Sequence, residues 1–237
     1  MLELDTVSRK KARFQAKGII IPQELVDELE IKYNAPAVKT GRLVFCLKAS
    51  SDNQNLVPVF VVNGKRVSQS PFRMVKYGSS YEIWEENKKY TDIIMMPRPR
   101  FYDLSTSDGV RMFKVAVIVA PGHLRAIVNQ KCLYYELGKP CKFCAVQNWW
   151  DSNIQKTSAQ VAETVIAGAK ENAVKHASLT TATRDTKGKG LEELVETARL
   201  ISSKITIPLM LEFEPPSDFG LLESLLKEAK ATGVTTI

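Results

Sequence analysis

The chain has 237 residues, of which 44% are apolar, enough to bury a substantial core in one large or two small domains. It lacks a run of about 18 apolar residues and a basic-then-apolar start, so we expect neither a membrane-spanning helix nor a signal peptide. Four cysteines are too few for a secreted disulfide scaffold of this length. We therefore expect a cytoplasmic protein with reduced thiols.

The positive charge belongs to the first half of the chain. Residues 1–125 carry 20 Lys and Arg against 13 Asp and Glu, whereas residues 126–237 carry 13 of each. A basic half can attract nucleic acid. Basic residues are densest in the short run at residues 9–13. Such a run is also typical of a solvated terminal segment. Nucleic-acid binding is therefore a secondary hypothesis.

Residues 1–100 are predicted to form a small α+β domain. The segment 19–31 (IIIPQELVDELEI) indicates a helix, because apolar residues recur at helical spacing after Pro22. The segment 41–48 (GRLVFCLK) then reads as an apolar strand. Its Cys46 is expected to behave as a small hydrophobic residue.

Two further strands are predicted at 57–67, joined by Asn63-Gly64, a pair favoured in tight hairpin turns. The stiff segment PRPRF at 97–101 is the predicted boundary between a first domain (1–100) and a second (101–237). After it, residues 113–130 contain two strand-like runs that break at Pro121-Gly122.

Strands and helices alternate through the second domain, which favours parallel βα units. A capping box of Thr157 and Gln160 marks the first helix. The predicted strands are 125–130, 176–181, 207–214 and 234–237, and the predicted helices are 157–173, 190–203 and 218–231. Because the sequence stops inside the last strand, we expect further βα units beyond Ile237.

The loop after the first of these strands, KCLYYELGKPCKFCAV (131–146), contains a C-x8-C-x2-C array of Cys132, Cys141 and Cys144. A structural zinc site needs four ligands, and His123 could supply the fourth. A thioredoxin-like redox pair would leave Cys132 unexplained. Three buried, purely structural cysteines would fit poorly in a polar loop that contains glycine and proline.

Three thiolates with one open position suit a 4Fe–4S cluster that leaves one iron for a substrate or cofactor. A three-cysteine loop directly after the first strand of a βα series resembles the radical S-adenosylmethionine (SAM) superfamily. In that family an aromatic residue stands close to the final cysteine, as Phe143 precedes Cys144 here. The family usually has three residues in the first spacing, and this chain has eight. The resemblance covers roughly residues 126–237.

The resemblance also implies cofactor-binding residues at the end of the second strand, where the family often has Gly-Gly-Glu. Here the matching residues are Thr180, Thr181, Ala182 and Thr183, which would receive the amino group of SAM. Phe143 would pack beside the adenine region of SAM, or else anchor the loop in the core.

The third strand ends in EFEPP, which places Glu212 and Glu214 on one face by strand alternation. Acidic residues at the mouth of a parallel barrel lie where such barrels carry chemistry. Glu214, nearer the mouth, is the candidate catalytic residue. Glu212 is a candidate cofactor-binding residue, or a residue paired inside the barrel.

The resemblance therefore implies a partial (β/α) barrel of the radical-SAM type, preceded by the α+β domain. It implies an enzyme that cleaves SAM reductively with a 4Fe–4S cluster, generates a 5′-deoxyadenosyl radical and abstracts hydrogen from an unidentified substrate. An electron donor such as a flavodoxin or ferredoxin would be a partner. The alternative function is a zinc- or cluster-bearing nucleic-acid-binding module without catalysis.

Overall fold

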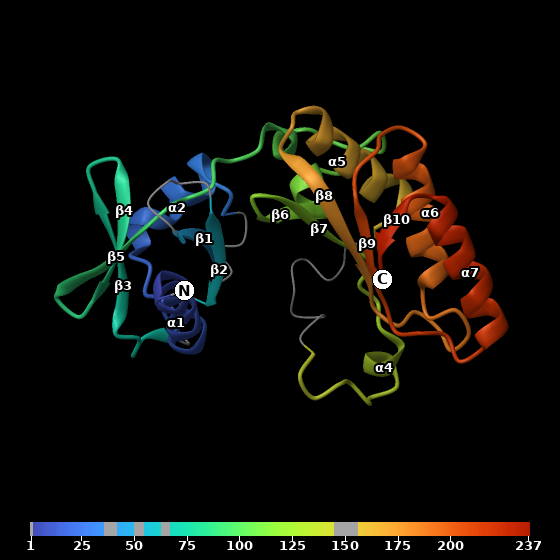
Figure 1. Cartoon of the computed structure of the whole chain (residues 1–237), viewed down its shortest axis with the longest axis horizontal. Helices are drawn as coiled ribbons and strands as arrows, with labels where there is room; N and C mark the ends of the chain where they lie inside the picture. The colour runs from blue at the N-terminus through green and yellow to red at the C-terminus, as the bar shows by residue number, and fades with distance from the viewer. Residues whose placement is uncertain (1, 36–41, 50–54, 63–66, 145–155) are drawn as a thin grey trace. The chain divides into compact units, whose positions relative to one another are not determined.

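The structure is a computed structural model (Figure 1) that describes residues 2–35, 42–49, 55–62, 67–144 and 156–237. The chain packs as two compact units. Unit 1 comprises the described residues as far as Pro99 together with Val119–Pro121, and unit 2 comprises those of Arg100–Ile118 and Gly122–Ile237. None of the described helices is both long and apolar enough to cross a membrane.

Unit 1 combines two helices with two antiparallel sheets. Its elements are α1 (Leu2–Lys17), α2 (Gln23–Lys32), β1 (Arg42–Lys48), β2 (Leu56–Val62), β3 (Phe72–Tyr77), β4 (Ser80–Glu85) and β5 (Lys88–Ile93). Strand β1 pairs with β2, and β3, β4 and β5 form a meander. The backbones of Cys46 and Ile94 exchange two hydrogen bonds of 2.8 and 2.9 Å, which join β1 to the residue after β5.

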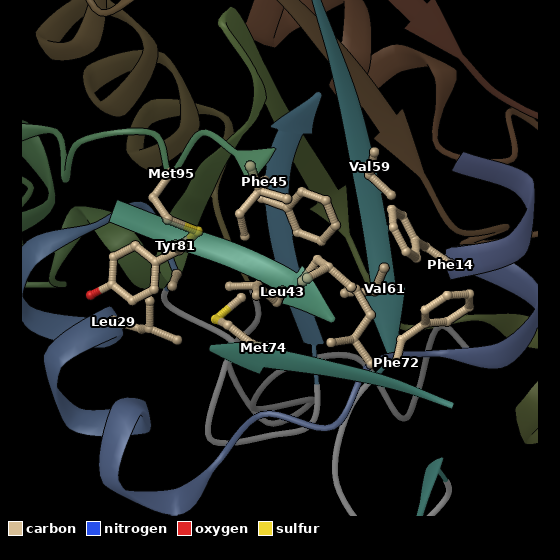
Figure 2. Packing of buried hydrophobic residues seen from close by; sticks show 14 of the residues in the cluster. Phe14, Leu29, Leu43, Phe45, Val59, Val61, Phe72, Met74, Tyr81 and Met95 are labelled. Atoms are coloured by element: carbon tan, nitrogen blue, oxygen red, sulfur yellow. The ribbon is translucent and has the colours of Figure 1, made fainter. Parts of the chain in front are cut away.

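The core of unit 1 lies between its helices and sheets (Figure 2). The ring of Phe14 on α1 meets Phe72 edge-to-face at 4.9 Å and Phe45 at 5.9 Å. Helix α2 buries the apolar face that its spacing predicted, including Leu29. The predicted hairpin turn at residues 63–64 lies outside the described residues.

The basic run near the N-terminus lies on α1, and part of it contacts unit 1 itself. Arg13 forms an ion pair with Glu85 and donates a 2.9 Å hydrogen bond to Tyr90. Lys10 donates to the Thr91 hydroxyl at 3.2 Å. At least two of these cations are therefore engaged within unit 1.

Unit 2 is an α/β unit in which the predicted alternation of strands and helices is confirmed. Its elements are the 3-10 helix η2 (Arg100–Asp103), α3 (Met112–Val115), β6 (Ala116–Ala120), β7 (Gly122–Asn129), α4 (Leu133–Glu136), α5 (Ser158–Lys170), β8 (Val174–Thr181), α6 (Leu191–Ser202), β9 (Leu209–Glu212), α7 (Phe219–Ala231) and β10 (Val234–Thr236). Strand β6 continues into the segment assigned to unit 1. Strand β9 is shorter than predicted, since it lies between Pro208 and Pro215-Pro216.

These strands form one open sheet in the order β10-β9-β8-β7-β6. The pairs β7–β8, β8–β9 and β9–β10 are parallel. Only Pro121 separates β6 from β7, and so short a connection requires the two strands to run antiparallel. The sheet is thus mixed, and the strands that the structure describes do not close into a barrel.

Helices α5, α6 and α7 lie side by side along the sheet (Figure 1). The capping box of α5 is confirmed: the Gln160 backbone N–H donates to the Thr157 hydroxyl at 3.2 Å, and the Thr157 N–H donates to Gln160 Oε1 at 3.0 Å. A Cβ added to Gly168 would lie 2.6 Å from a Val174 methyl carbon, so α5 and β8 are in close contact there. The parallel strands and this helix layer place the loops after β7, β8 and β9 at one edge of the sheet.

Candidate functional site

Asn129, the last residue of β7, fixes the start of the cysteine loop. Its carbonyl accepts a 2.8 Å hydrogen bond from the Ala182 N–H, just beyond β8. Its side-chain amide donates to the Lys131 carbonyl at 2.9 Å and accepts from the Lys131 N–H at 3.1 Å. The chain therefore leaves β7 in a defined direction, held against the end of β8.

Cys132 follows at the N-terminal cap position of the short helix α4. Its carbonyl accepts from the Tyr135 N–H at 3.1 Å, and the next residue, Leu133, donates its N–H to the Thr183 carbonyl at 2.7 Å. Cys132 is buried, Cys141 is exposed and Cys144 is half-buried. The exposure of the last two contradicts a purely structural role in a core.

The phenol of Tyr135 links two parts of the cysteine loop. The Tyr135 hydroxyl donates a hydrogen bond to the Cys144 carbonyl. Burial raises the pKa of Tyr135, and the charges of Cys144, Cys132 and Cys141 raise it further. The described residues nevertheless contain no group of three or more His, Cys, Asp or Glu side chains already arranged to hold a metal ion. The three thiols stand in one loop of the sequence but are not arranged as metal ligands in the described residues.

The donor set fits an iron–sulfur cluster in its chemistry, since three free cysteines stand in one loop segment. Cys46 is separate from them, fully buried on β1 of unit 1, where burial raises its thiol pKa to about 11. His123 does not complete a zinc site with Cys132. It lies six residues before Asn129 in β7, about 20 Å along an extended strand.

The end of β8 adjoins this loop. The Thr181 hydroxyl donates to the Ala182 carbonyl at 3.0 Å, and the Ala182 carbonyl also faces the Asn129 amide at 3.4 Å. Thr180 and Thr181 are half-buried, whereas Thr183 is buried. The four residues predicted to hold SAM thus lie beside the strand end from which the cysteine loop begins.

Glu214 connects three segments at this edge of the sheet. Its carboxylate accepts from the Tyr134 hydroxyl at 2.8 Å and from the Thr183 hydroxyl at 2.6 Å, and it forms an ion pair with Lys189. Burial acts to raise the pKa of Glu214, but the hydrogen bonds from Lys189, Thr183 and Tyr134 outweigh it, so the pKa lies below its usual value. An ionised carboxylate with three donors is better suited to holding segments together than to transferring protons.

The remaining predicted site residues are placed as follows. Glu212, the last residue of β9, forms a 2.5 Å ion pair with Arg125 of β7, as expected for a residue paired within the sheet. Phe143 keeps 92% of its surface exposed. The alternative that Phe143 anchors the loop in the core is therefore wrong, because a core anchor must be buried.

Four residues of this site were not predicted from the sequence: Asn129, Tyr134, Tyr135 and Lys189. Tyr134 and Lys189 reach Glu214 across 80 and 25 positions of the chain. No local pattern marks such pairs. Asn129 could have been identified from the sequence, because a buried polar residue at the end of an apolar strand needs a hydrogen-bond partner.

Comparison with protein-family models, with curated proteins and with solved structures found no match for this chain. A functional assignment therefore depends on the residues and the geometry described above.

Proposed function

We propose that the protein is a radical SAM enzyme that uses a 4Fe–4S cluster and SAM to abstract hydrogen from a substrate still to be identified. One observation carries the proposal. The segment with Cys132, Cys141 and Cys144 leaves the carboxyl end of β7, an interior strand of the sheet, and is fastened to the ends of both following strands. This is where α/β proteins place their ligands.

The fold supports the same proposal. Strands β7 to β10 are parallel neighbours in sequence order, and helices connect β8 to β9 and β9 to β10. We infer that they are the first strands of a (β/α) barrel of the radical-SAM type. In such a barrel the cysteine loop lies at the carboxyl mouth, the end that carries the chemistry.

Cys132, Cys141 and Cys144 would hold three irons and leave the fourth open to the amino and carboxylate groups of SAM. When bound, these cofactors would supply the reductive cleavage of the sulfonium C–S bond and a 5′-deoxyadenosyl radical. A low-potential donor such as a flavodoxin or ferredoxin would supply the electron.

The chain's own residues would bind and orient these groups. Residues 180–183 stand beside the cysteine loop and offer small side chains and backbone oxygens to the methionyl amino group. Phe143 is exposed and free to stack on adenine. Glu214, with Tyr134 and Lys189, would keep the loop against the strand ends. A fixed loop would keep the cluster ligands in one position relative to the strand ends.

Anaerobic reconstitution with iron and sulfide tests the proposal. We expect about four irons per chain and a broad visible charge-transfer band. With a low-potential reductant and SAM, the loaded protein should release 5′-deoxyadenosine even without its substrate. Alanine at Cys132, Cys141 or Cys144 should each remove both signals.

The matched control is Cys46→Ala, which removes a buried thiol from unit 1 and should keep both signals. Iron-loaded protein that neither binds SAM nor releases 5′-deoxyadenosine would falsify the enzymatic function. Colourless protein that holds zinc and binds nucleic acid with a steep salt dependence would replace it with the non-catalytic binding module.

A further inference from the structure

The face of the sheet opposite the helix layer carries a polar cluster that the proposed function does not use. The buried apolar residues of β7, β8 and β9 alternate along each strand and include Leu124, Ala126, Ala177, Leu179, Leu209 and Leu211. Because side chains alternate between the two faces of a strand, the residues between them share the other face. On that face β7 carries His123, Arg125 and Ile127, β8 carries His176, Ser178 and Thr180, and β9 carries Met210 and Glu212. The polar cluster consists of His123, Arg125, His176, Ser178 and Glu212.

The members of this cluster are in contact with one another. His123 and His176, the chain's two histidines, are register partners whose rings stack with centroids 4.5 Å apart. His123 Nε2 lies 2.6 Å from the Ser178 hydroxyl oxygen. Arg125 pairs with Glu212, which fixes the position of the guanidinium group. The strand register thus gathers two imidazoles, a guanidinium and a hydroxyl on one face.

Part of the cluster is exposed to solvent. His176 is exposed, and the Arg125 side chain keeps 41% of its surface in contact with solvent. A guanidinium has five N–H donors in a planar fork that matches two oxygens of a carboxylate or phosphate. The ion pair with Glu212 uses one nitrogen of that fork, Nη2.

The charges of the cluster favour an anion. Burial lowers the pKa of His123, the charges of His176 and Arg125 lower it further, and Glu212 acts in the opposite direction. Protonating the stacked pair therefore brings cations together, which is unfavourable without a counter-charge. Glu212 is the one carboxylate of the cluster, and it is engaged by Arg125. An oxyanion bound on this face would supply the counter-charge that a protonated histidine pair needs.

We infer that this face of the sheet binds the anionic group of a small-molecule ligand, a carboxylate or phosphate, through Arg125, His123 and His176. Arg125 lies four residues before Asn129, about 13 Å along the strand. A ligand anchored there can extend toward the cysteine loop. If the proposed function holds, the ligand is the substrate, and only this last statement rests on that function.

Two histidines in the whole chain allow a direct test by NMR. The full-length protein, without iron or SAM and with labelled histidine, gives two imidazole C2–H signals. Inorganic phosphate, and succinate in a parallel arm, should shift both signals saturably. Binding should also raise the pKa of His123, because the anion stabilises its charged form. Sodium chloride at the same ionic strength is the reference.

Two arginine variants distinguish a specific anion-binding site from a general effect of positive charge. Arg125→Gln should weaken phosphate binding about tenfold, since it removes a charge-assisted donor. Arg199→Gln on α6 is the matched control, because Arg199 is also an ion-paired arginine of unit 2, bonded to Glu228. That variant should bind phosphate as the wild type does. An unchanged amide spectrum would show that each variant is folded.

Two results would overturn the inference: histidine shifts no larger than in sodium chloride, or an equal loss of phosphate affinity in both arginine variants. In a further arm with Zn²⁺, histidine shifts with the metal and with neither anion would also overturn it. A response to only one of the two anions would identify the ligand's anionic group. Because no cofactor is present in this experiment, its outcome is independent of whether the protein cleaves SAM.

Discussion

Replacing Glu214 by alanine would remove the carboxylate that joins the cysteine loop to the ends of β8 and β9. Tyr134 and Thr183 donate to it at 2.8 and 2.6 Å, and Lys189 forms an ion pair with it. The Lys189 side chain is only 12% exposed, so the variant leaves a mostly buried ammonium without this carboxylate. We expect unit 2 to lose stability and the loop to loosen.

The expected loss in unfolding free energy depends on how exposed the Glu214 carboxylate is. A hydrogen bond to a charged group contributes about 1.5–3 kcal/mol when buried. The Glu214 side chain keeps 35% exposure, so water replaces part of each bond. We therefore assign about 1 kcal/mol to each hydroxyl bond and about 1 kcal/mol to the ion pair. The expected loss in unfolding free energy is about 2–3 kcal/mol.

The pH dependence has a definite sign. The pKa of Glu214 is lowered in the folded protein from an ordinary value of 4.5. A lowered carboxyl pKa contributes stability that is complete above the unfolded-state pKa and is lost as the pH falls through the folded-state pKa. The difference between the wild type and Glu214→Ala should therefore be constant near neutral pH and shrink below about pH 4.5.

Urea unfolding at neutral and acidic pH measures this difference, and hydrogen exchange reports on the loop. The Leu133 amide, bonded to the Thr183 carbonyl at 2.7 Å, should exchange faster in the variant. Glu223→Ala removes a carboxylate from an exposed pair on α7 and should cost less than about 0.5 kcal/mol. If the Glu214 variant lost no more than this control and kept its Leu133 protection, the reasoning would be refuted.

Alkylation of the native protein near neutral pH, followed by mass spectrometry, should modify the exposed Cys141 first and leave Cys46 intact, because burial raises the Cys46 pKa to about 11. Early labelling of Cys46 would contradict its place in the core. Gly168→Ala should lower the unfolding free energy by about 1–2 kcal/mol, because the new methyl group would lie 2.6 Å from a Val174 methyl carbon. This steric clash outweighs the gain in helix propensity. Gly220→Ala, whose Cβ would meet only a carboxylate oxygen at 3.3 Å, is the helical control and should be neutral or stabilising in thermal unfolding.

The sequence alone determined the features whose partners lie close along the chain. The capping box of Thr157 and Gln160 joins residues three positions apart, and α5 begins where it predicted. The strands and helices of unit 2 follow from periods of two and about four residues, which are local properties. The spacing of Cys132, Cys141 and Cys144 likewise placed three thiols in one loop without any knowledge of the fold.

The alternation of strands and helices also predicted where that loop would begin. Parallel strands bring their carboxyl ends to one edge, so residues 180–183 and Glu214 were expected near Cys132. The structure places Thr183 against both Leu133 and Glu214. What the pattern could not provide was the role of Glu214, because that role depends on Tyr134 and Lys189.

Only the tertiary structure decided the contacts that depend on strand register and on loop closure. A shift of one residue between β7 and β8 would separate His123 from His176 and move one of them to the other face of the sheet. Register is set by packing of the whole apolar face against α5 and α6, which no short window of sequence contains. For the same reason the ion pair of Arg125 and Glu212, 87 positions apart, was not predictable residue by residue.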